Sequence, residues 1–149
     1  MKALVQRVGR AAVRVEAEEI GRIGQGLLIF LGVASEDPPG VEERLALRCA
    51  ELRIFEDDRG RMNRSVRDIG GGALVVPQFT LVADTSRGRR PSFDSAAPPE
   101  RAEKVFQAFC GALEELGVPI GRGRFGASME VELVNMGPAT FLLESHTGF

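Results

Sequence analysis

Residues 27–31 read Leu-Leu-Ile-Phe-Leu, an uninterrupted run of large apolar side chains. The run has the length of a strand, and apolar side chains at every position are typical of a strand covered on both faces. A turn-rich stretch, residues 21–26, precedes it. We therefore predict the central strand of a sheet here, around which the rest of the chain packs.

A first helix is predicted directly after this strand. Asp37 and Pro38 supply an N-cap followed by a proline at the first helical position. Apolar residues then recur at helical spacing up to residue 52. These residues are Val41, Leu45, Cys49 and Leu52.

A second helix is predicted further along the chain. Pro98-Pro99-Glu100 is typical of a helix start, and Gly117 followed by Pro119 is typical of a helix end. Apolar residues between these signals repeat at helical spacing and form one face. They are Val105, Phe106, Phe109, Leu113 and Leu116.

Alternation of apolar and polar side chains predicts strands at both ends of the chain. Residues 3–5 and 13–15 indicate two half-buried strands joined through Gly9 as a hairpin. Residues 129–133 and 139–143 indicate two more strands, separated by the turn-forming sequence Asn-Met-Gly-Pro. The chain is therefore predicted to close on a C-terminal β-hairpin.

The middle of the chain contributes further strands. Residues 53–55 lead into the turn-rich tetrad 57–60, so a short strand pair is predicted to flank this tetrad before the glycines 70–72, and residues 73–76 predict the next strand. Each helix thus lies between strands. The predicted fold class is α/β: a single compact domain of mixed β-sheets with two crossover helices on one side.

The composition is that of one globular domain, residues 1–149. A chain of 149 residues with 44% hydrophobic and 27% charged residues is neither disordered nor fibrous. No apolar stretch approaches the roughly 20 residues needed to cross a bilayer, so no membrane partner is expected. Because the net charge is -2, contacts with nucleic acid require local basic clusters.

The cysteine and histidine content narrows the possible chemistry. Cys49 and Cys110 fall on apolar helix faces and are predicted to be buried thiols of a reducing compartment, the cytoplasm. The one histidine, His146, lies near the C-terminus, which disfavours a Ser-His-Asp constellation. Zinc-ligand spacing and phosphate-loop patterns do not occur. Catalysis must therefore use hydroxyls, carboxylates or backbone groups.

The sequence Pro77-Gln78-Phe79-Thr80-Leu81 interrupts the apolar strand 73–76. Proline cannot donate to a sheet ladder, so the strand is expected to end or bulge here. Gln78 and Thr80 would then present free backbone amides, which can bind an oxyanion. The simpler interpretation is an edge strand with a β-prone threonine. Gly137-Pro138, taken alone, indicates only a turn.

Four stretches together resemble the D-aminoacyl-tRNA deacylase family over essentially the whole chain. These are Met-Lys-Ala-Leu-Val-Gln-Arg-Val (residues 1–8), Gln78-Phe79-Thr80-Leu81, Arg90-Pro91-Ser92-Phe93 and Asn135-Met136-Gly137-Pro138-Ala139-Thr140. The family's first motif usually begins with serine. Here that position is Pro77, so no hydroxyl role falls to it.

The resemblance implies a cytoplasmic homodimer that acts on aminoacyl-tRNA. Such a protein hydrolyses the ester between a D-amino acid, or glycine, and the terminal adenosine, with neither cofactor nor metal. The implied catalytic residues are Gln78, Phe79 and Thr80. Backbone amides around Phe79 and Thr80 would face the scissile carbonyl, and the ribose 2′-hydroxyl would assist from the RNA side. An activated ester needs no more than positioning, oxyanion binding and an ordered water.

The resemblance also implies the substrate-binding residues. Gly137-Pro138 would be a cis peptide that enters the partner's pocket, accepts the substrate ammonium and sterically rejects an L side chain. Arg7 would help to anchor the opposing Gly-Pro hairpin across the dimer. Phe125, Gly126, Ala127 and Met129 resemble the pocket for the terminal adenine. Phe125 and Met129 can equally be core residues.

Several arginines are candidates for contacts with tRNA phosphates. They are Arg122, Arg124 and the arginines of residues 87–90, which lie in a long loop, residues 83–97. Their simpler role is solubility.

Two other functions fit the sequence. The first is an esterase of small acyl esters with Thr80 as nucleophile, although no neighbouring base is evident. The second is a dimeric RNA-binding module without enzymatic activity, suggested by the lack of histidine, cysteine and metal constellations.

Overall fold

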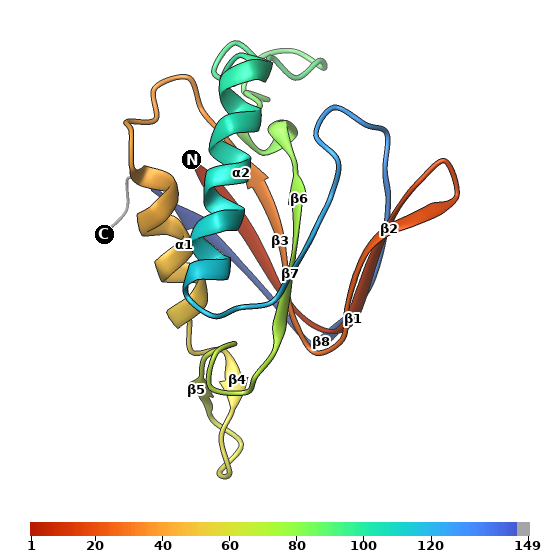
Figure 1. Ribbon diagram of the computed structural model, residues 1–149. Helices are drawn as coiled ribbons and strands as arrows, with labels where there is room; N and C mark the ends of the chain where they lie inside the picture. Colours follow the sequence, from red (N-terminus) through yellow and green to blue (C-terminus); the bar gives the residue numbers. More distant parts are fainter. Residues whose placement is uncertain (146–149) are drawn as a thin grey trace.

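A computed structural model describes residues 1–145, so His146 lies outside the described residues. These residues form a six-stranded sheet, a two-stranded sheet, two α-helices and a short 3₁₀ helix (Figure 1). The strands are β1 (Lys2–Val15), β2 (Glu18–Ile23), β3 (Gly26–Gly32), β4 (Phe55–Glu56), β5 (Met62–Arg64), β6 (Gly72–Pro77), β7 (Ile120–Arg122) and β8 (Glu130–Glu144). The helices are α1 (Val41–Glu51), α2 (Pro99–Glu115) and the 3₁₀ helix η1 (Phe79–Val82).

The main sheet is mixed and has the strand order β2-β1-β3-β6-β7, with β8 paired to β1. Strand β6 runs parallel to β3 and β7, whereas β1 runs antiparallel to β2, β3 and β8. Helix α1 lies in the connection from β3 to β6, and α2 in that from β6 to β7. The predicted α/β fold with two crossover helices is therefore confirmed, as are the short strand pair β4–β5 and the strand β6.

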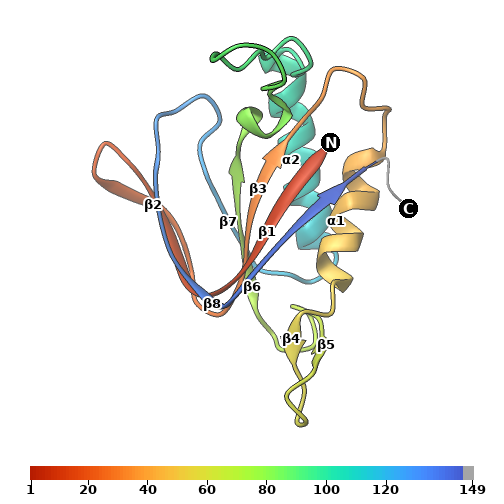
Figure 2. The same ribbon diagram turned by 180° about the vertical axis from the view of Figure 1, so that it is seen from behind.

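Both helices cover the same face of the sheet and pack against each other (Figures 1 and 2). Most of the apolar side chains predicted to face the core are buried there, and Leu52, Val105 and Leu116 are half-buried against it. In α1 and α2 those that are at most 1% exposed include Leu45, Cys49, Phe106, Phe109 and Leu113. They belong to one cluster with alternate residues of β3, namely Leu27, Ile29 and Leu31.

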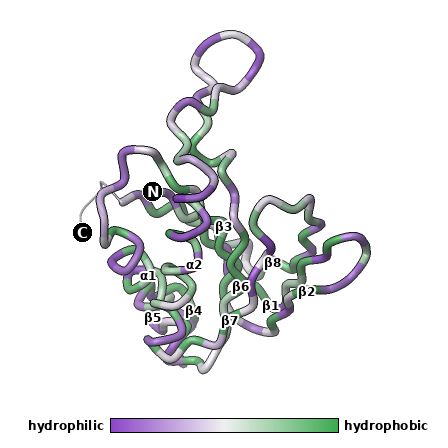
Figure 3. Tube along the Cα trace, turned by 45° about the horizontal axis from the view of Figure 1, so that its top comes forward, coloured by the Kyte–Doolittle hydropathy of each residue, from purple (hydrophilic) through white to green (hydrophobic). Residues whose placement is uncertain are grey.

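The opposite face of β3 and β6 is covered by the sheet itself. Leu28 of β3 and Leu74 of β6 pack in a second cluster with Val8, Val13 and Ile23 of β1 and β2. Figure 1 shows that β1 and β8 bend together, so that their far halves and β2 swing away from the helices. Figure 3 colours β3 and β6 largely as hydrophobic, which agrees with strands that are covered on both faces. The prediction of a central strand buried on both faces is confirmed.

Both hairpins predicted at the ends of the chain are wrong. Strands β1 and β8 are each continuous, and they pair with each other from Lys2 opposite Glu144 to Arg14 opposite Glu130. The pairing shifts register at two places on β1, between Gln6 and Val8 and between Val8 and Arg10, which lie opposite residues 134–140 of β8. The predicted turn residues therefore lie opposite each other and create irregularities within two long strands, instead of ending four short ones.

The predicted N-cap of α1 is also wrong. The helix begins at Val41, and its N-cap is Gly40 in a left-handed conformation with φ of 84°. The Asp37 carboxylate instead accepts a hydrogen bond from the Ala34 amide at 2.7 Å and pairs with the amino group of Met1. Asp37 therefore organises the loop before the helix.

The alternation of buried and exposed positions on α1 predicts a large difference between two neighbouring leucines. Leu45 is fully buried, whereas Leu47 is 40% exposed. Leu45→Ala should lower the free energy of unfolding by about 2–5 kcal/mol, because it leaves a cavity. The matched control, Leu47→Ala, should change it by less than about 0.5 kcal/mol. Urea denaturation followed by circular dichroism measures both, and equal losses would contradict this packing.

Candidate functional site

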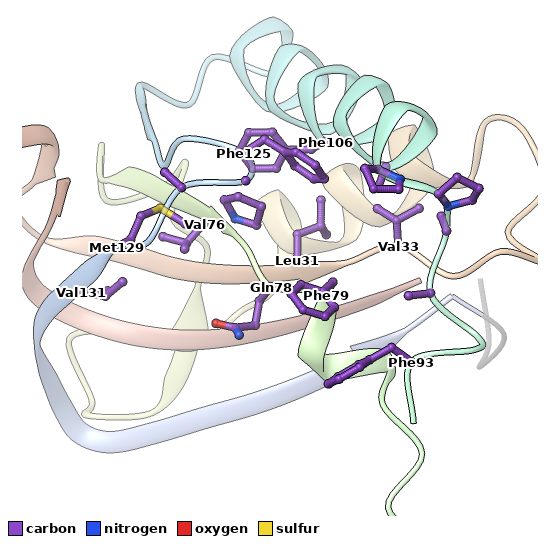
Figure 4. Close-up of a pocket in the computed structure, with 18 residues that line it drawn as sticks. Leu31, Val33, Val76, Gln78, Phe79, Phe93, Phe106, Phe125, Met129 and Val131 are labelled. Atoms are coloured by element: carbon purple, nitrogen blue, oxygen red, sulfur yellow. The ribbon is translucent and has the colours of Figure 1, made fainter. Parts of the chain in front are cut away.

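A cavity of about 680 Å³ opens at the carboxyl ends of β3 and β6. It is bounded by η1, by the start of α2 and by residues 123–129, the loop that joins β7 to β8 (Figure 4). Leu31, Val33, Val76 and Phe106 give it apolar walls. The carboxyl ends of parallel strands are the usual place for a ligand in α/β folds.

Pro77 ends β6 at the edge of this cavity, as predicted for the interrupted strand. It is the last residue of β6 in register with β3, opposite Leu31. On the other side, β7 stops at Arg122, and the next amide, that of Gly123, donates to the Val75 carbonyl oxygen at 2.8 Å. The proline therefore stands where the ladder between β6 and β7 has already ended, so its missing N–H costs no sheet hydrogen bond.

The pair of amides without partners differs from the pair expected from the interrupted strand, Gln78 and Thr80. The Gln78 amide, expected to be free, donates to the Leu31 carbonyl oxygen at 2.8 Å, so that expectation is wrong. The first hydrogen bond of η1 runs from the Leu81 amide to the Gln78 carbonyl oxygen, at 3.2 Å. The amides of Phe79 and Thr80 precede this bond and have no partner among residues 1–145. Two adjacent N–H donors thus lie beside the cavity.

Phe79 and Phe93 form an aromatic pair at the cavity. Their ring centroids are 4.9 Å apart and the rings meet edge to face, at 62°. Phe79 is 55% exposed and Phe93 is 38% exposed, although both line the cavity (Figure 4). The sequence reasoning assigned no role to Phe93, even though it closes the quoted motif of residues 90–93.

Thr80 does not line the cavity, although the sequence reasoning placed it in the catalytic motif. Its side chain is exposed, and its hydroxyl oxygen accepts a hydrogen bond from the side-chain amide nitrogen of Gln78. An amide nitrogen donates but cannot take up a proton. The hydroxyl therefore has no general base among its hydrogen-bond partners in the described part of the chain.

The four residues predicted for the adenine pocket all line the cavity. They are Phe125, Gly126, Ala127 and Met129. They lie in the loop before β8, and Met129, which was predicted to begin a strand, belongs to this loop as well. This loop needs special backbone geometry, since Gly126 has φ of 79°. Phe125 and Met129 are half-buried and also pack on the two core clusters, so core and pocket roles coincide.

Gly137 and Pro138 lie elsewhere, exposed on β8 and outside the cavity of their own chain. The peptide bond between them is cis. The Arg7 side chain holds this segment: Nε donates to the Met136 carbonyl oxygen at 2.8 Å, and Nη1 donates to the Ile54 carbonyl oxygen at 2.6 Å. Arg7 thus fixes the Gly-Pro segment of its own chain, and the predicted contact of Arg7 across the dimer stays a prediction.

Polar side chains hold the segment from both ends. The Asn135 side-chain oxygen accepts a hydrogen bond from the Ala139 amide at 2.7 Å, which closes the segment on itself. The Asn135 and Gln6 side-chain amides both donate to the Thr140 hydroxyl oxygen, at 2.9 and 3.2 Å. The sequence reasoning gave these three residues no role. The quoted motif of residues 135–140 contained two of them.

The arginines named for phosphate contacts differ in their availability. The Arg122 guanidinium pairs with Glu114 and donates to Gln107, both on α2, so it is engaged within the chain. Arg124 and the arginines at positions 87, 89 and 90 are exposed and have no partner within residues 1–145.

Other chemistries find little support in the described residues. Residues 1–145 contain no group of three His, Cys, Asp or Glu placed to hold a metal ion. No helix in that range is long and apolar enough to span a membrane. Cys49 and Cys110 are free and buried, as predicted, and burial raises the pKa of each thiol to about 12. Neither thiol is suited to act as a nucleophile.

Comparisons with known proteins agree with the quoted motifs. A family model described as D-Tyr-tRNA(Tyr) deacylase matches residues 4–144. The chain is 57% identical over 145 residues to the D-aminoacyl-tRNA deacylase of Roseiflexus castenholzii, covering 97% of this chain and 92% of the relative. It is 54% identical over 144 residues to that of Deinococcus radiodurans, covering 97% and 99%.

Two solved structures share the fold. One, named as the c-Myc DNA Unwinding Element Binding Protein, superposes with a TM-score of 0.91 at 40% identity and covers 97% of this chain and 98% of its own. The other, a probable eukaryotic D-amino acid tRNA deacylase, has a TM-score of 0.80 at 16% identity and covers 95% and 97%. At that identity the second match supports the fold alone.

These similarities place the protein among the hydrolases and support deacylase function. The chain belongs to the D-Tyr-tRNA(Tyr) deacylase family. The family resemblance drawn from the four motifs is therefore confirmed.

The two buried thiols should be unreactive in the folded protein. With a pKa of about 12, only about one thiol in 10⁴ is ionised at pH 8, against a substantial share at the free-cysteine pKa of about 8.5. Iodoacetamide should label neither Cys49 nor Cys110 at pH 8 until denaturant is added. Because the folded pKa is raised, their contribution to stability should decline as the pH rises above about 8.5. Equal labelling rates with and without denaturant would contradict the buried positions.

Proposed function

We propose that this protein is an aminoacyl-tRNA editing hydrolase. It hydrolyses the ester that joins a D-amino acid to the terminal adenosine of tRNA and releases free amino acid and tRNA. It acts in the cytoplasm as a homodimer, without a cofactor. Membership of the deacylase family supports the reaction class, and the cavity at the ends of β3 and β6 provides a site of suitable size.

The observation that carries the proposal is the pair of adjacent amides at Phe79 and Thr80, which have no partner within residues 1–145 and stand beside an apolar cavity. Ester hydrolysis passes through a tetrahedral intermediate with a negatively charged oxygen. Two backbone N–H donors can bind that oxygen, and such an interaction is worth more in an apolar, water-poor setting than in water. An activated ester then needs no histidine.

The substrate itself supplies the remaining catalytic group. Among residues 1–145, no histidine and no cysteine lines the cavity, and Gln78 is the one lining side chain that carries an amide. The terminal ribose carries a 2′-hydroxyl next to the ester, where it can orient a water molecule or transfer a proton. We therefore assign the assisting hydroxyl to the RNA and the oxyanion donors to the protein.

The same contacts argue against Thr80 as a nucleophile. A threonine hydroxyl requires a base to remove its proton, and the hydrogen-bond partner of Thr80 is the donor group of Gln78. The hypothesis of a Thr80 esterase thus gains nothing from the geometry, and the family match disfavours the alternative of a non-enzymatic binding module.

Selection against L-amino acids is assigned to Gly137 and Pro138 of the partner subunit. Three facts support this: the segment is exposed, it lies outside the cavity of its own chain, and Arg7 and Asn135 hold it in a fixed shape. A rigid exposed segment is suited to enter a neighbouring cavity. There its carbonyl oxygens would accept the substrate ammonium group, and its backbone would occupy the space of an L side chain.

Two consequences follow for the substrate range. Glycine has no side chain to reject, so mischarged glycyl-tRNA(Ala) is also a substrate. The terminal adenine is assigned to the loop of Phe125, Gly126, Ala127 and Met129, where an aromatic ring and a close backbone can contact a flat base.

The deciding assay compares matched D- and L-aminoacyl-tRNA at catalytic amounts of protein. The D-ester should be preferred about 5–150-fold, because forcing an L side chain against packed backbone costs about 1–3 kcal/mol. A substrate ending in 2′-deoxyadenosine should react about 10²–10⁴-fold more slowly, the usual contribution of a positioned proton-transfer group.

Thr80→Ala is the companion variant in this assay. Its turnover should equal that of the wild type. Loss of turnover in Thr80→Ala, with full activity on the 2′-deoxy ester, would transfer catalysis to the threonine. Hydrolysis of neither ester would leave the binding module as the function.

Gly137→Ala should disable the exposed segment. A Cβ at this position would lie 2.6 Å from Nη2 of Arg7, and φ is 133°, a conformation that alanine avoids. Either the Arg7 guanidinium moves and releases the segment that it holds, or the segment itself shifts. A displacement near 1 Å in a positioning group can cost about 10²-fold in rate. Gly111→Ala in α2 is the control, since its Cβ would meet nothing within 4 Å. If both variants keep wild-type D-ester turnover, the segment has no part in the reaction.

A further inference from the structure

The loop of residues 84–92 is a closed structure with a fixed stem. The amides of Asp84 and Ser92 each donate to the other residue's carbonyl oxygen, both at 2.8 Å. Within the loop, the Ser86 amide donates to the Asp84 carboxylate at 2.9 Å, and Gly88 adopts a φ of 67°. The stem thus gives a short exposed turn a defined base.

This loop carries positive charge that no other part of residues 1–145 neutralises. Arg87, Arg89 and Arg90 are exposed, and none has an ion-pair or hydrogen-bond partner within residues 1–145. Asp84 is the acidic residue of the loop. Its carboxylate accepts hydrogen bonds from Ser86, and these hold the pKa of Asp84 below the usual value. By contrast, other arginines in the chain are engaged, among them Arg7, Arg14 and Arg122.

The stem of the loop lies at the edge of the cavity. Phe93 follows Ser92 directly, lines the cavity and packs edge to face on Phe79, whose amide is one of the two without partners. Figure 4 shows the two rings side by side at the cavity. The loop that carries the three arginines is therefore joined through Phe93 to the cavity assigned to the ester.

We propose that Arg87, Arg89 and Arg90 bind phosphates of the RNA strand that leads to the terminal nucleoside. The inference rests on the proposed function, because that function puts the end of an RNA chain in the cavity. Guanidinium groups bind phosphate through paired hydrogen bonds. An overall net charge of -2 gives no general attraction for RNA, so affinity must come from a local cluster such as this one.

Phosphate contacts have a recognisable signature. They position the substrate without taking part in the chemistry, so their loss raises KM and leaves kcat at saturating substrate nearly unchanged. They also make binding salt-dependent, with a slope of about -0.7 per phosphate for single-stranded RNA. Three contacts amount to a slope of about -2, or about 15–20-fold weaker binding on going from 50 to 200 mM salt.

The test compares the triple variant Arg87→Ala/Arg89→Ala/Arg90→Ala with the wild type on esters of increasing length. The substrates are a D-aminoacyl nucleoside without phosphate, a D-aminoacyl trinucleotide and full-length D-aminoacyl-tRNA. The ratio of kcat/KM on full-length ester to that on the nucleoside ester should fall about tenfold or more, and the salt slope should weaken by about 2. A defect already present on the trinucleotide assigns the contacts to the single strand, and one that arises only with full-length tRNA assigns them to the duplex.

Arg59→Ala/Arg61→Ala is the matched control. These arginines lie beside β5 in the β4–β5 hairpin, at the opposite end of the molecule from the start of α2 (Figure 1). The control should retain the wild-type ratio and salt slope. The proposal is overturned if the triple variant keeps the wild-type ratio and slope, or if the control loses as much. Because the nucleoside ester reports folding and chemistry, a misfolded variant cannot imitate the expected result.

Failure of the proposed function is distinguishable from failure of this inference. If the wild type hydrolyses none of the three esters, the deacylase proposal fails. Binding of uncharged tRNA, measured with the same variants across the same salt range, still tests the arginine loop. Equal affinities of wild type and triple variant there would overturn the inference independently.

Discussion

The antiparallel pairing of β1 with β8 is the interaction on which the rest of the structure depends. One edge of β1 is paired with β8 over nearly its whole length, whereas the other edge is divided between β3 and β2. The strand therefore has to change direction between its two halves, and β8 bends with it (Figure 2). The bend gives β3 and β6 their second cover and creates the irregular pairing from which Gly137 and Pro138 protrude. The bend of β1 and β8 thus accounts both for the second cover of the central strands and for the exposure of the Gly-Pro segment.

Local patterns predicted the parts of the fold that depend on local physics. The two helices and β3 are correct, because periodicity, helix end signals and an apolar run report on burial of neighbouring residues. The two hairpins are wrong because Gly9 and Gly137-Pro138 have the composition of turns. Whether such residues end a strand or bend it depends on the pairing partner, here a strand more than a hundred residues away, and that information is nonlocal. The prediction of Asp37 as a helix cap was wrong for the same reason, since its carboxylate pairs with the distant amino group of Met1.

The candidate site was predictable in its parts more than in its arrangement. Proline in an apolar strand correctly marked the end of β6, but the chain gave no sign that Leu31 would take up the Gln78 amide. The motif residues Gln78, Phe79, Phe125 and Met129 do meet in one cavity. Arg7 holds the segment of Gly137 away from this cavity, and its guanidinium group also donates a hydrogen bond to the Ile54 carbonyl oxygen. No spacing rule states such a contact, since it requires the register of β1 against β8.

The division of these residues into two places has a consequence for the assembly. Within one chain, the cavity has donors for an oxyanion and apolar walls but lacks the segment proposed to read chirality. A chain that carries both a cavity and an exposed rigid segment can complete the proposed site only with a second copy. In a dimer with twofold symmetry each chain gives its segment and receives another, so one interaction completes two sites at once. In the proposed dimer Arg7 would act on the reaction from a distance: by fixing Met136 in its own chain, it would set the position of a group that acts in the other.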